Sequence, residues 1–134
     1  GHGGCLGTLH ATYPRDTLTR LETMALMSDV ELPLQAMRLQ IASGVNVIVQ
    51  VSRLTDGSRK VTHITEVAGF DVNSGRYEIH DLFARSYHGK DEHGRIRSEL
   101  VATGHIPSFV SQLAEHGKEL PAAVYDAARA KEEQ

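Results

Sequence analysis

Residues that could do chemistry are concentrated at the start of the chain, in segment 1–12. His2, Cys5 and His10 lie there among glycines, which allow the backbone to approach a ligand closely. Imidazole and thiolate groups are good zinc ligands, but three of them in a glycine-rich segment, with no fourth at a suitable spacing, make a poor closed site. The segment is therefore predicted to be a functional loop that holds no metal.

A phosphate-binding loop of the form G-x-x-x-x-G-K-[S/T] is absent from the sequence. Both Gly-Lys pairs, Gly89-Lys90 and Gly117-Lys118, are followed by an acidic residue and lack the upstream glycine. The spacing indicates no Ser-His-Asp arrangement and no pair of catalytic carboxylates. Chemistry on a nucleotide would therefore need a phosphate cradle from outside this sequence.

Composition and charge are typical of a soluble globular domain. Of the 134 residues, 40% are hydrophobic and 23% charged, and the formal net charge is -3. Because basic residues are dispersed among acidic ones, no nucleic-acid partner is expected. Cys5 is the only cysteine, and no apolar run is long enough to cross a membrane. The sequence thus favours a cytoplasmic protein without direct membrane insertion.

A pair of helices is expected to position the loop. Pro14, an acidic first turn and an apolar stripe predict a helix from about Pro14 to Met27. Pro33 opens a second helix, which Gly44 is expected to end in a left-handed conformation. A short acidic connection joins the two helices.

Three antiparallel strands are expected after the helices. Valines alternate with other residues over 45–54, and Asp56-Gly57 is a favoured hairpin turn before a return strand over 59–70. A second turn leads to a shorter strand over 76–83.

The rest of the chain is expected to be a loop and two helices. Residues 84–99 are polar and contain glycines, which predicts a mobile loop without a fixed shape. Pro107 and Pro121 each open a helix, the second one reaching Ala128 before a frayed tail. The sequence therefore predicts one α/β domain with a loop at 1–12, a helix pair and strands over 14–83, the polar loop at 84–99 and helices over 100–134.

The start of the chain resembles a known motif. Residues 1–11, Gly-His-Gly-Gly-Cys-Leu-Gly-Thr-Leu-His-Ala, are similar to the histidine box of type II/IV secretion ATPases, roughly T-G-H-x-G-S-x-x-T-x-H-A-N. Cys5 replaces its serine and Thr12 its asparagine, which affects fine geometry more than identity. Later segments resemble the CpaF-like branch that powers tight-adherence pili, namely 14–16, 20–22, 33–34, 40–43, 102–104, 107–109 and 120–121.

This resemblance implies the C-terminal portion of a RecA-like P-loop ATPase core. Such a core forms a hexamer, binds ATP and Mg²⁺, and powers pilus assembly or protein export beside platform proteins of the inner membrane. Its phosphate-binding loop and acidic Mg²⁺ motifs would precede the histidine box, so the chain alone is expected to hold no cofactor and to be inactive as an ATPase.

The resemblance also assigns roles to five residues. His10 matches the second histidine of the box and would lie near the γ-phosphate, with His2 as the first histidine. Thr8 and Gly4 would lie close to phosphate, and Arg20 is the first choice for a residue that reaches a neighbouring subunit's nucleotide.

Each of these residues also has a structural interpretation. His10 could be an unpartnered terminal histidine and His2 a remnant of cloning, while Thr8 could bond local backbone. Arg20 could form a surface salt bridge, as could the other candidate arginines of the helix pair, Arg15 and Arg38.

Two alternatives stay open for the whole chain. It could be a non-enzymatic interaction module that docks on a larger assembly. It could also associate through the valine strand, over 45–54, if that strand leaves an unpaired edge.

Overall fold

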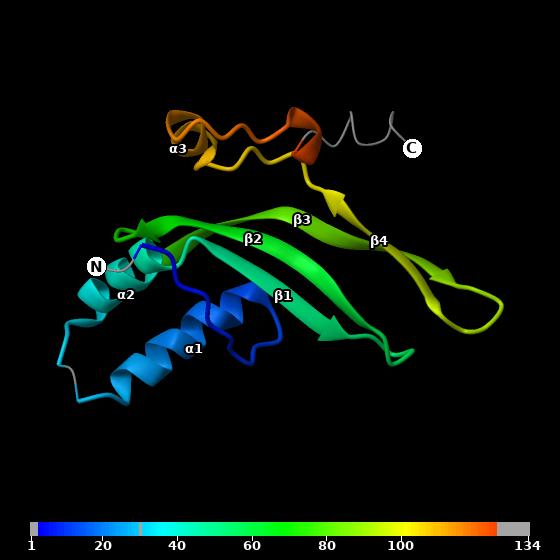
Figure 1. The fold of residues 1–134 in the computed structure, drawn as a ribbon. Coiled ribbons are helices and arrows are strands. Elements are labelled where there is room, and N and C mark those ends of the chain that lie inside the picture. Colours follow the sequence, from blue (N-terminus) through cyan, green and yellow to red (C-terminus); the bar gives the residue numbers. More distant parts are fainter. Residues whose placement is uncertain (1–2, 30, 126–134) are drawn as a thin grey trace.

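A four-stranded antiparallel sheet with helices on both faces forms the frame of the molecule (Figure 1). The computed structural model describes residues 3–29 and 31–125. The predicted mixed α/β composition is confirmed, with one strand more than expected. His2, the predicted helical extension to Ala128 and the tail lie outside the described residues.

The strands of the sheet pair in chain order. They are β1 (Val47–Arg53), β2 (Arg59–Asp71), β3 (Arg76–Lys90) and β4 (Ile96–Ala102). Each is antiparallel to its neighbour, so β1 and β4 form the two edges.

The polar segment 84–99 is a hairpin, which corrects the prediction of a loop without fixed shape. β3 continues to Lys90, β4 begins at Ile96, and Asp91 accepts backbone hydrogen bonds that close the turn between them. Most residues of this hairpin are exposed or half-buried. Because neither face is deeply buried, polar side chains occupy strand positions, and the alternation that marks a half-buried strand is missing.

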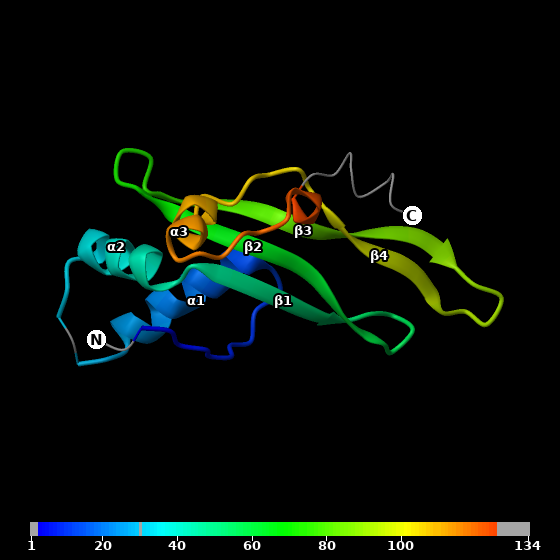
Figure 2. The same ribbon diagram turned by 45° about the horizontal axis from the view of Figure 1, so that its top comes forward.

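Helices α1 (Pro14–Leu26) and α2 (Leu34–Gly44) cover one face of the sheet (Figures 1 and 2). Their predicted bounds are correct to within a residue. The start of α1 is fixed by Asp16, whose carboxylate accepts the backbone N–H of Tyr13 at 3.1 Å. Gly44 does not take the expected left-handed conformation, because the chain passes directly into the extended residue Val45.

The C-terminal segment lies over the opposite face of the sheet (Figure 2). It contains helix α3 (Val110–Glu115) and the short 3-10 helix η1 (Ala122–Val124). Helix α3 is shorter than the helix predicted from Pro107, and the described part of the helix predicted from Pro121 is a 3-10 turn. In the described ranges, no helix has the length and apolar character needed to cross a membrane.

The apolar core lies between α1 and the sheet. Leu18 of α1 is completely buried against Ile48 of β1 and Val67 of β2. The half-buried side chains around them belong to α2, β3 and the residue after α2, namely Ile41, Ala42, Val45, Tyr77 and Ile79. The core thus fixes α1, and with it the segment that precedes α1, against the sheet.

The valines of β1 point away from this core. Val47, Val49 and Val51 are 40%, 55% and 53% exposed, whereas Ile48 and Gln50 between them are buried. The edge strand therefore presents an apolar stripe to solvent.

Asp56 joins two hairpins that are distant in sequence. Its carboxylate accepts the backbone N–H of Ile96 at 2.7 Å and both the N–H and the hydroxyl of Ser58. These bonds, that of Ile96 first, lower the pKa of Asp56 to about 2. The turn between β1 and β2 is thereby attached to the start of β4.

Candidate functional site

A depression of about 560 Å³ lies between the N-terminal segment and α1. It brings together two residues that the sequence singled out, His10 and Arg20. The other residues that line it are Ala11, Thr12, Asp16, Thr19, Thr23, Met24 and Met27. Those from α1 recur at three- and four-residue spacings, which places them on one side of the helix.

The N-terminal wall of the depression is fixed through β1. The backbone carbonyl of Ala11, next to His10, accepts a hydrogen bond from the side chain of buried Gln50 at 2.9 Å. Because Gln50 lies on a strand that packs against α1, this bond holds the histidine segment beside the helix. This contact could not be predicted from local sequence, because Gln50 and Ala11 are 39 residues apart.

The polar groups of the depression suit an anion. Arg20 offers a guanidinium, and no carboxylate in the described part of the chain forms an ion pair with it. His10 is exposed and offers a ring nitrogen, while the hydroxyl of Thr23 is engaged with the carbonyl of Thr19 at 3.1 Å. A phosphate can accept hydrogen bonds from arginine and imidazole donors. Asp16 is the only acidic residue in the lining, so the depression does not fit a resident Mg²⁺ ion.

Thr8 and Gly4 do not line this depression. Both are exposed, and Gly4 has a φ of 90°, a left-handed conformation that favours glycine. The structure thus brings together two of the four predicted site residues that it describes.

Arg38 is held in a structural ion pair between the two helices. Its Nε lies 2.9 Å from Oε1 of Glu22, and a second guanidinium nitrogen donates to Oε2 at 3.1 Å. The guanidinium also lies over the ring of Phe70, 5.8 Å from its centroid. The salt-bridge interpretation is confirmed for this arginine, which leaves Arg20 as the better candidate for a ligand contact.

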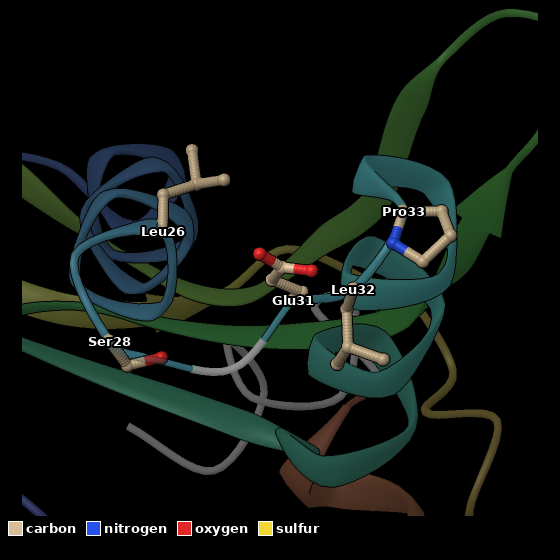
Figure 3. Close-up of a pocket in the computed structure, with 5 residues that line it drawn as sticks. All are labelled: Leu26, Ser28, Glu31, Leu32 and Pro33. Carbon is tan, nitrogen blue, oxygen red and sulfur yellow. The ribbon is translucent and has the colours of Figure 1, made fainter.

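A second depression, of about 490 Å³, separates the end of α1 from the start of α2 (Figure 3). It is lined by Leu26, Ser28, Glu31, Leu32 and Pro33, with the Glu31 carboxylate between Leu26 and Leu32. Among the residues that the structure describes, its lining holds a carboxylate and no cationic side chain, and the remaining side chains are mainly apolar. This depression therefore offers no anion site.

The remaining histidines belong to the sheet and its surroundings. His63 on β2 contacts Thr62 at 3.1 Å, and His88, expected in a loop, lies on β3 at 3.2 Å from Glu99. His93 lies in the β3–β4 turn. Over residues 3–29 and 31–125, no three His, Cys, Asp or Glu side chains are placed to hold a metal ion.

One buried acidic residue carries no clear signal in the sequence. Glu66 on β2 is 1% exposed and accepts hydrogen bonds from Ser108, before α3. Its only signal in the sequence is its position within a strand rich in apolar residues.

Comparison with known proteins gives no family: no family model matches the chain, and no curated protein is significantly similar to it.

Proposed function

We propose that the chain is the C-terminal part of a hexameric secretion or pilus-assembly ATPase with a RecA-like core. In this proposal His10 and Arg20 contact the phosphates of an ATP that other parts of the assembly hold with Mg²⁺. Two features support it: the resemblance of residues 1–11 to a histidine box, and the depression that both side chains line. The depression is the observation that carries the proposal.

The charges of the depression suggest what each residue would do. Arg20 would stabilise the negative charge that develops on the γ-phosphate during hydrolysis. His10 would donate a hydrogen bond to the same phosphate and so respond to its loss. The resulting movement of the N-terminal segment would reach β1 through the bond between Ala11 and Gln50.

Calorimetry with ATP and Mg²⁺ tests this function directly. The chain is compared with a protein extended upstream to include any coding sequence that precedes Gly1. We expect the extended protein to bind ATP and the chain alone not to bind it, because the chain has no phosphate-binding loop. Binding by the chain alone would contradict the assignment.

Substitutions in the extended protein then test the two residues. Arg20→Ala and His10→Ala should each lower the turnover of ATP, by about a hundredfold for the arginine. Arg15→Ala is the matched control, because Arg15 lies on the same helix but not in the lining of the depression. If all three variants hydrolyse ATP as fast as the unmodified extended protein, the depression has no part in the reaction.

The wider setting follows from the same proposal. The protein would act in the cytoplasm as a hexamer and reach the inner membrane only through platform proteins.

A non-enzymatic interaction module is the second candidate. Apolar side chains at the end of α1 favour it, since Leu26 and Met27 are 60% and 82% exposed. Failure of the extended protein to bind ATP would make this module the better interpretation.

A further inference from the structure

A buried carboxylate attaches the C-terminal segment to the sheet, on the face opposite α1. Oε1 of Glu66 accepts hydrogen bonds from the backbone N–H of Ser108, at 2.9 Å, and from its hydroxyl. We call residues 104–117 the strap. The strap follows directly on Thr103, whose N–H donates to the carbonyl of Leu82 at 3.0 Å. Glu66 therefore joins the sheet to the strap through the hydrogen bonds from Ser108.

The second oxygen of this carboxylate is buried without a hydrogen bond. Within residues 3–29 and 31–125, Oε2 of Glu66 has no partner in hydrogen-bond geometry, and its ion-pair partner there is Nε2 of His105, at 3.5 Å. An unsatisfied charged oxygen in the interior is costly. A positive charge on His105 would compensate it directly.

A second histidine connects His105 to β3. The ring of His105 stacks on that of His80, with centroids 4.2 Å apart and planes at 17°. Nε2 of His80 lies 3.3 Å from Oε1 of Glu78. The ionisable groups of the cluster therefore follow the order Glu78, His80, His105 and Glu66, with the two imidazoles between the two carboxylates. In the described part of the chain, no other charged group forms an ion pair with either ring.

This order of groups favours one added proton over none or two. With both imidazoles neutral, the two carboxylates face no positive charge. With one of the two rings protonated, a single cation lies between the two carboxylates. A second proton would place two stacked cations against each other, and their mutual repulsion disfavours that state.

We infer that the strap is a proton-dependent device, which holds the sheet more tightly when the His80–His105 pair carries one proton. Histidine changes its charge between about pH 5 and pH 8. The attachment should therefore strengthen as the pH falls from 8 to 6 and weaken again as it rises. Buried Pro107 supplies a contact that does not depend on pH, so the strap loosens at high pH without unfolding the sheet.

Hydrogen exchange of the whole chain, followed by mass spectrometry between pH 6 and pH 8, tests this inference. After correction for the intrinsic exchange rate, amides of the strap should exchange roughly fivefold more slowly at pH 6 than at pH 8, the factor that one partly exposed ion pair supplies. Amides of the β1–β2 hairpin should show no such change.

Two substitutions identify the group responsible. His105→Asn should abolish the pH dependence, and it replaces a side chain that is 37% exposed, so folding is retained. His88→Asn is the matched control, because His88 also faces a glutamate, Glu99, but lies outside the strap. This variant should keep the pH dependence of the original protein.

Two results would overturn the inference. One is equal protection of the strap at pH 6 and pH 8 in the unmodified chain, which requires no variant. The other is a pH dependence that survives His105→Asn unchanged.

Discussion

Asp56 has a different kind of pH dependence from the strap. Its pKa is lowered to about 2 by the N–H of Ile96 and then by Ser58, and the unfolded chain has no such bonds. A carboxylate with a lowered pKa stabilises the fold above its unfolded pKa, near 4. That contribution is lost as the pH falls toward 2.

Removing this carboxylate should therefore destabilise the protein above about pH 4 and progressively less below it. In urea unfolding at pH 6, Asp56→Ala should have a lower midpoint than the original chain, and the difference should shrink steadily between pH 4 and pH 2. Glu92→Ala, in the exposed turn between β3 and β4, is the control and should behave like the original chain. A difference in midpoint that is the same at pH 6 and at pH 2 would contradict the role assigned to Asp56.

Part of the candidate site could be predicted residue by residue. His10 and Arg20 stand out because residues 1–11 resemble a histidine box, in which His10 matches the second histidine, and because Arg20 lies on the helix that follows. Glu66 does not stand out, since one acidic residue in a strand is usually solvent-facing. Its burial depends on Ser108, 42 residues later in the chain, and no local pattern encodes that contact.

At the scale of elements, helices and hairpins with strong local signals were predicted correctly, whereas elements with weak signals were not. Pro14 and the Leu18 stripe determine α1, and Asp56-Gly57 places the first hairpin. β4 could not be predicted from its own composition. Its extended conformation depends on its backbone pairing with β3. Helix α3 begins only at Val110, because the residues after Pro107 form a turn in which the Val110 N–H donates to the Pro107 carbonyl at 3.2 Å, and it ends before Gly117, which has a φ of 67°.

Leu18 tests how far α1 depends on its packing. Leu18→Ala should destabilise the protein by about 2 to 5 kcal/mol, because the side chain is fully buried between α1 and the sheet. Leu39→Ala on α2 is the matched control; its side chain is 46% exposed, and we expect a change within about 0.5 kcal/mol. Chemical unfolding measures both. Equal losses for the two variants would mean that the core is not where the structure places it.

At the scale of the whole molecule, the two edges of the sheet differ in character. β4 carries Arg97 and Glu99, and charges on an edge strand hinder pairing with another chain. β1 has no charged residue before Arg53 and exposes its valine stripe. The apolar edge is therefore where the molecule is least protected against self-association.

A charge on β1 should remove this tendency. We expect the original chain to associate as its concentration rises and Val49→Lys to stay monomeric with an unchanged unfolding midpoint. Sedimentation velocity over a range of concentrations measures the association, with Glu99→Lys on the other edge as the control. A chain that remains monomeric at millimolar concentration would show that the edge is harmless.

The strand order has a consequence for how fast the molecule folds. Because every strand pairs with its neighbour in the chain, each pairing closes only a short loop, and short loops close quickly. The sheet can therefore grow one hairpin at a time, starting from any of its three turns. The bond from Ile96 to Asp56 spans 40 residues, so we expect it to form later than the hairpin turns, which close much shorter loops.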